Sequence, residues 1–166
     1  MKIAVPLGAI LALAVALPGQ EKPKDVDGWD KIKWGMTLEE ARDAYGITTP
    51  FFETKYWTSL VLNPVKIGDM EMIGGADAKH GTRKISQVGF NLGFDKPGYA
   101  GGFDTLKTLL IQKYGTPVSQ ENTTEYGHWV KRVLWTFPSS SIVLEAEPAF
   151  ISLQYKATDM KALDKL

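Results

Sequence analysis

Hydrophobic residues recur along this chain with two spacings, one typical of helices and the other typical of strands. Leu38, Ala41 and Tyr45 fall on one face of a helix. Thr37 and Glu40 are placed as a capping box, in which each side chain satisfies the other residue's free backbone amide. This segment therefore predicts a short helix that begins after Thr37.

A second helix is predicted beyond the middle of the chain. Its apolar residues repeat every three or four positions, at Phe103, Leu106, Leu110 and Tyr114. Gly115 follows directly, and glycine commonly ends helices because it accepts the left-handed backbone conformation. When the Tyr-Gly pairs that end the two helices are overlaid, the preceding apolar positions also align, which suggests an internal duplication.

Strand-like segments follow each helix. We expect them at 55–62, 65–73 and 84–94 after the first helix, and at 129–137, 141–147 and 150–157 after the second. A turn at Asn63-Pro64 and a loop that begins at Gly74-Gly75 separate the first group. In the last segment apolar and polar residues alternate, as they do in a strand with one solvated face.

The expected architecture is α+β. An antiparallel sheet carries its helices on one face, in the order α-βββ-α-βββ, because a sheet with one apolar face must bury it against another layer. Residues 159–166 are expected to form a short terminal helix.

The N-terminus has the pattern of a secretory signal. One lysine precedes an uninterrupted apolar run of 15 residues from Ile3 to Leu17. A membrane-spanning helix needs about 20 such residues, so the run is typical of a signal peptide. We expect a signal peptide at 1–19, a solvated linker at 20–27 and a single domain at 28–166. An uncleaved membrane anchor is the alternative interpretation.

Composition narrows the functional classes. The 166 residues include 19 Lys and Arg against 19 Asp and Glu. This balance lacks the positive charge by which proteins bind nucleic acids or anionic lipids. Cysteine is absent, which excludes disulfides and thiol redox chemistry, so an exported domain of this kind depends on its core for stability.

Residues suited to metal binding or acid–base chemistry are few. His80 falls in a predicted loop and His128 precedes a predicted strand, without the spacing of a zinc site. A composite site of His128, Glu125 and Glu121 can be drawn, but an isolated polar histidine is more often solvated. We assign no catalytic, metal-binding or cofactor-binding residue and expect no cofactor.

The serine and carboxylate patterns likewise do not indicate a catalytic site. Ser139 to Ser141 lack the Gly-x-Ser-x-Gly elbow of hydrolases. Asp69 with Glu71, and Glu145 with Glu147, have the spacing of carboxylates on one face of a strand. Any solvent-facing strand shows the same spacing, and we favour that interpretation.

Four aromatic residues crowd the segment after the first predicted helix: Phe51, Phe52, Tyr56 and Trp57. In so short a segment they cannot all point the same way. They either cap the core, which we favour because large aromatics dominate small cores, or expose an adhesive patch. If one region contacts a partner, we expect it to be this one.

Two segments resemble small bacterial envelope proteins. Trp34-Gly35-Met36-Thr37-Leu38-Glu39-Glu40-Ala41, with Tyr45-Gly46, resembles the Gly-Met-Thr/Ser helix of SmpA/OmlA-type outer-membrane-assembly lipoproteins and of the β-lactamase-inhibitor-protein-like fold. Phe103-x-x-Leu106-x-x-x-Leu110-x-x-x-Tyr114-Gly115-x-Pro117 looks like the second helix of uncharacterised exported proteins of similar build. The resemblance implies a fold used for contacting other proteins and carries over no binding residue. This chain departs from those proteins because it has neither an acylated cysteine nor disulfides.

The sequence thus favours a periplasmic or secreted, non-enzymatic module that binds a protein or an envelope component through its sheet face or its aromatic segment. Nucleic acid is not an expected partner, and no stable membrane insertion is expected after signal cleavage. A small hydrolase acting on cell-wall or exported substrates is one alternative, with a site built from scattered acidic residues and His128. A small-ligand carrier with a pocket between helix and sheet is another.

Overall fold

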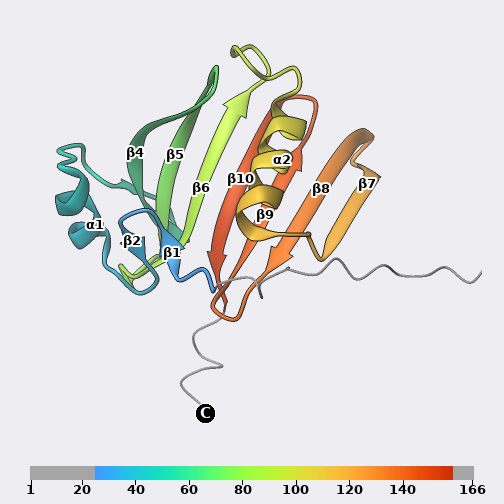
Figure 1. The fold of residues 1–166 in the computed structure, drawn as a ribbon. Coiled ribbons are helices and arrows are strands. Elements are labelled where there is room, and N and C mark those ends of the chain that lie inside the picture. The colour runs from blue at the N-terminus through green and yellow to red at the C-terminus, as the bar shows by residue number, and fades with distance from the viewer. Residues whose placement is uncertain (1–24, 159–166) are drawn as a thin grey trace, which may run out of the picture.

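An eight-stranded antiparallel sheet dominates the structure, a computed structural model that describes residues 25–158 (Figure 1). The α+β class is therefore confirmed, with more sheet than helix. The expected signal peptide at 1–19 and terminal helix at 159–166 lie outside the described residues. Across the sheet the strands follow the order β3 (Phe52–Glu53), β4 (Trp57–Ile67), β5 (Met70–Lys79), β6 (Ile85–Gly93), β10 (Phe150–Ala157), β9 (Ser140–Ala146), β8 (His128–Thr136) and β7 (Ser119–Glu125).

Four strands follow each helix, where the sequence predicted three. Strands β3 to β6 come after α1 (Leu38–Tyr45), and β7 to β10 come after α2 (Gly102–Tyr114). The two groups join where β6 pairs with β10. The additional strands lie at the two edges of the sheet. Strand β3 has two residues, and β7 consists of polar residues only, so neither produces an apolar alternation that a sequence pattern can reveal.

Two predicted breaks in the first group are wrong. Asn63 and Pro64 do not end a strand but lie within β4, at a shift of register between Leu62 and Val65. Proline is tolerated at such irregularities because a ladder hydrogen bond is missing there. The chain instead turns at Gly68, and Gly74-Gly75, expected to begin a loop, lies inside β5.

Local signals predict the start of α1 and the ends of both helices. Thr37 N–H donates to Glu40 Oε2 at 2.8 Å, and Glu40 N–H donates to Thr37 Oγ1 at 3.2 Å, which confirms the capping box of α1. Gly46 ends α1 with a positive φ of 62°. Gly115 follows α2 and donates its N–H to the carbonyl of Ile111.

One hydrophobic core lies on a single face of the sheet. Leu38 of α1 and Leu106 of α2 belong to the same buried cluster as alternate residues of the strands, and Figure 1 shows α2 in front of the sheet and α1 beside its β4 edge. A short hairpin of β1 (Gly28–Trp29) and β2 (Ile32–Lys33) adds Trp29, whose ring centroid lies 4.5 Å from that of Phe90. Neither helix in the described part of the chain has the length and hydropathy to cross a membrane.

Residues 25–27 contact the domain, although they were expected to belong to a solvated linker. Val26 is buried. The Asp25 carboxylate accepts hydrogen bonds from the hydroxyl and the backbone N–H of Ser139. Those two bonds lower the pKa of Asp25, because they stabilise its charged form. This contact attaches the start of the described chain to the β8–β9 turn.

Candidate binding surface

The face of the sheet opposite the core, here called the open face, is not covered by any helix of residues 25–158. In β5, Met72, Ala76 and Ala78 point into the core, so the residues between them point to the open face. Pairing extends this assignment across the sheet. In its centre the open face presents Asp77, Gln87, Asn91 and Gln154.

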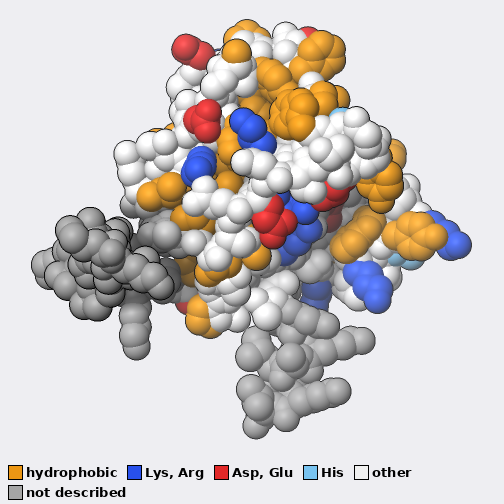
Figure 2. All heavy atoms as spheres, turned by 90° about the vertical axis from the view of Figure 1, so that its right-hand side faces the viewer, with side chains coloured by type: hydrophobic (Ala, Val, Ile, Leu, Met, Phe, Trp, Pro, Cys, Tyr) orange, Lys and Arg blue, Asp and Glu red, His pale blue; other side chains and the backbone are white. Residues whose placement is uncertain are grey.

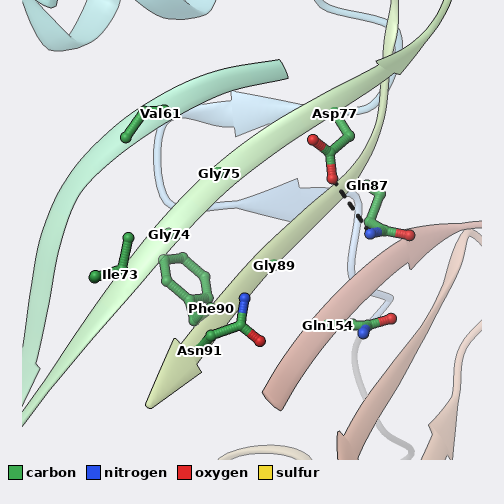
Figure 3. A pocket seen from close by; sticks show the side chains of 10 residues that line it. All are labelled: Val61, Ile73, Gly74, Gly75, Asp77, Gln87, Gly89, Phe90, Asn91 and Gln154. Atoms are coloured by element: carbon green, nitrogen blue, oxygen red, sulfur yellow. Dashed lines mark hydrogen bonds between the residues drawn. The ribbon is translucent and has the colours of Figure 1, made fainter. Parts of the chain in front are cut away.

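A hollow of about 250 Å³ lies in the centre of the open face. Its floor is formed by Gly75 of β5 and Gly89 of β6, which stand directly opposite each other. Val61 and Ile73 lie on one side of the glycines, and the carboxamide side chains lie on the other (Figure 3). The hollow exists because two neighbouring strands both lack a side chain at the same level of the sheet.

Asp77 is the acidic residue among those that line the hollow. Its carboxylate accepts one hydrogen bond from Ser59 Oγ and another, of 3.3 Å, from Gln87 Nε2. Both carboxylate oxygens are therefore engaged by neutral donors. The rim of the hollow is therefore polar, and its one acidic group is stabilised by hydrogen bonds from uncharged side chains.

Exposed apolar side chains lie on the β3–β5 side of the open face, and two of them, Val61 and Ile73, line the hollow. Phe52 is 63% exposed, Trp57 43%, Val61 49% and Ile73 59%. They share the open face because Phe52 pairs with Ser59, Val61 pairs with Gly75, and alternate residues of one strand point the same way. We call these four residues the edge patch.

The four aromatic residues that the sequence singled out differ in burial. Phe51 packs against the core, and the guanidinium groups of Arg42 and Arg83 lie 5.0 and 4.9 Å from its ring centroid. Phe52 and Trp57 belong to the edge patch, and Tyr56 is exposed in the connection between β3 and β4. Core packing, the favoured interpretation, therefore holds for Phe51 and not for the other three.

Ion pairs occupy the β7–β9 end of the open face. Arg132 Nε lies 2.6 Å from Glu145 Oε2, and Arg132 Nη1 lies 3.3 Å from Glu125 Oε1. The hydrogen bond with Glu145 is the main reason that the pKa of Arg132 is raised. Figure 2, which looks onto the β7 edge of the sheet, shows acidic and basic side chains next to each other in the middle of that view.

The composite site drawn from the sequence is not assembled. His128 Nε2 lies 3.2 Å from Glu147 Oε2, whereas Glu125 pairs with Arg132. Glu121 is exposed on the edge strand β7, and His80 is exposed beyond the end of β5. Within residues 25–158 no group of three or more His, Cys, Asp and Glu side chains is arranged to hold a metal ion.

The serine and carboxylate candidates are engaged with other side chains. Ser139 is bound to Asp25. Glu145 pairs with Arg132, Glu147 lies beside His128, and Glu71 pairs with Lys66 at 3.5 Å.

An apolar pocket of about 180 Å³ lies on the core side, between α2 and the sheet. Leu106, Leu109 and Leu110 of α2 form one wall, and Trp29 and Tyr155 contribute to the others. Burial raises the pKa of Tyr155, so its hydroxyl stays neutral. This pocket is separated from the glycine hollow by the sheet itself.

Sequence reasoning missed the glycine hollow. Glycines inside a strand often mark a close approach of a ligand or another backbone, and that signal was present at Gly75 and Gly89. The signal was not recognised because Gly74-Gly75 also has the composition of a loop.

Comparisons of the chain with protein-family models, with curated proteins and with solved structures found no match.

Proposed function

We propose that this protein is an exported, non-enzymatic module that binds a protein or an envelope component through its open face. The observation that carries the proposal is the edge patch beside the polar centre of that face. Four large apolar side chains stand exposed together there, and soluble domains normally bury such groups or use them for binding.

The chemistry of the open face favours a protein as the partner. Across the sheet it passes from the apolar edge patch to carboxamides and then to ion pairs around Arg132. Protein interfaces combine aromatic anchors with a polar, hydrogen-bonding surround in this way. The ion pairs would contribute more to orientation than to affinity.

Two further parts of the proposal rest on the sequence. The apolar run from Ile3 to Leu17 supports export, to the periplasm or the outside of the cell. The order of a helix and four strands, found twice, supports the internal duplication that the two Tyr-Gly helix ends suggest.

The test is capture of a partner from an envelope extract of the host by the immobilised full chain. We expect Trp57→Ala to remove about 2 kcal/mol or more of binding free energy, because exposed aromatic anchors carry much of an interface. Its thermal midpoint should change little. Tyr126→Ala is the matched control, because Tyr126 is 98% exposed in the β7–β8 turn at the opposite edge of the sheet.

Two results would contradict the proposal. In the first, Trp57→Ala retains the same partner with unchanged affinity while Tyr126→Ala loses it. In the second, Trp57→Ala lowers the midpoint as strongly as a core substitution, which would place the indole in the core.

The apolar pocket supports a second candidate function, the binding of a small apolar molecule. A cavity of about 150 Å³ in another protein admits benzene, so the 180 Å³ beside α2 are enough for a small ring. We expect indole to shift the methyl resonances of Leu106 and Leu110 saturably, and Leu110→Phe to weaken that binding by filling the pocket. Unchanged methyl resonances at saturating indole would exclude this function.

A further inference from the structure

The fold does not require glycine at two positions of the hollow. Gly75 and Gly89 both lack the positive φ that favours glycine. A Cβ on Gly75 would come no closer than 3.5 Å to another atom, the carbonyl oxygen of Leu60, and one on Gly89 no closer than 3.9 Å, to Gln154 Cγ. Both are ordinary contacts, so the sheet would accept larger residues at either position.

The adjacent Gly74 shows the contrast. A Cβ there would lie 2.4 Å from Cε1 of Phe90, so packing in the core requires glycine. Glycine weakens the interior of a strand because it loses more conformational freedom and packs no side chain. Two such residues, opposite each other and facing outwards, indicate that something approaches the backbone from the open side.

The size of the hollow limits what can lie on the glycines. Its volume of about 250 Å³ exceeds the ~150 Å³ that holds benzene in an engineered cavity. An aromatic side chain with its first methylene group therefore fits. The peptide planes of β5 and β6 form the floor, and Val61 and Ile73 supply an apolar wall (Figure 3).

The chemistry of the rim indicates what surrounds that side chain. Gln87, Asn91 and Gln154 are neutral carboxamides, and each can donate and accept hydrogen bonds. A peptide group carries the same pair, one N–H donor and one C=O acceptor. The three carboxamides are thus complementary to the two backbone amides that flank one residue of a protein, while the carboxylate of Asp77 beside them already accepts hydrogen bonds from Ser59 and Gln87.

We propose that the hollow over Gly75 and Gly89 binds one aromatic side chain of a protein partner, whose flanking backbone amides bond to the carboxamides of the rim. This inference rests on the proposed function and specifies it further. The edge patch would then contact the partner beside the inserted residue, and the glycines would permit its ring to lie against the sheet.

The test is a titration of the ¹⁵N-labelled full chain with N-acetyltryptophanamide, an aromatic side chain between two amide groups. We expect saturable shifts of the side-chain amide resonances of Gln87, Asn91 and Gln154. N-acetylalaninamide is the matched ligand control and should shift them at least about tenfold more weakly, because it lacks the ring that fills the hollow.

Variants locate the binding. Gly75→Val and Gly89→Val each place a side chain in the hollow and should weaken the binding of N-acetyltryptophanamide at least tenfold. Thr123→Val is the matched control, because it adds valine at an exposed position of β7, and it should leave binding unchanged. The dispersion of the backbone spectrum shows that each variant is folded.

Three outcomes would overturn the inference: no shifts up to the solubility limit of the amide, equal shifts with the alanine analogue, or binding of N-acetylglucosamine to the same carboxamides in place of the aromatic amide. If the hollow fails in this way while partner capture still depends on Trp57, the proposed function stands without this inference. If capture fails and the titration succeeds, the hollow binds an aromatic amide and the proposed function is wrong.

Discussion

Trp135→Ala is expected to lower the free energy of unfolding by about 3–5 kcal/mol, the usual cost of truncating a large buried aromatic. Trp135 is only 1% exposed. Its indole Nε1–H donates a hydrogen bond of 2.8 Å to the carbonyl oxygen of Gly115, the residue that ends α2. The substitution therefore leaves a cavity in the core and removes the bond that ties the end of the helix to β8.

Urea unfolding followed by far-ultraviolet circular dichroism is the appropriate measurement, because the substitution alters tryptophan fluorescence. Trp129→Ala is the matched control on the same strand. Trp129 is 46% exposed and has Lys131 Nζ 6.0 Å from its ring centroid, so its loss should cost at most about 1 kcal/mol. Both indoles lie on the same face of β8 and differ in burial, so equal losses for the two variants would mean that Trp135 is no more buried than Trp129.

Two adjacent glycines should respond in opposite ways to the same substitution. Gly74→Val forces a side chain against the Phe90 ring, which cannot easily move because it is buried against Trp29. Overpacking of this kind costs about 1–3 kcal/mol. Gly75→Val points to the open face, where valine suits a strand, so we expect a change within about 0.5 kcal/mol or a small gain in stability.

The midpoints of urea unfolding for the two variants test this contrast, with unchanged slopes as the condition for comparing them. Gly89→Val should behave like Gly75→Val, since the two glycines lie opposite each other on the same face. A large loss of stability in Gly75→Val would give that glycine a role in folding. It would also remove the reason for regarding the hollow as a binding site.

The sequence by itself determined the existence of both helices, the start of α1 and the C-terminal end of each. The capping box at Thr37 and the glycines after Tyr45 and Tyr114 act within one or two turns, so the residues that decide them are neighbours in the chain. It also determined which residues of the well-patterned strands face the core, because alternation is a property of each strand alone.

Only the tertiary structure decided how the strands are arranged. Strands β3 and β7 form because a neighbouring strand offers free backbone groups to pair with, and β7 has no apolar pattern of its own. The same holds for the candidate site. That Gly75 stands opposite Gly89, with Gln154 next in line, depends on register between segments far apart in the chain. Local sequence patterns do not reveal that register, because it is set by packing of the whole core.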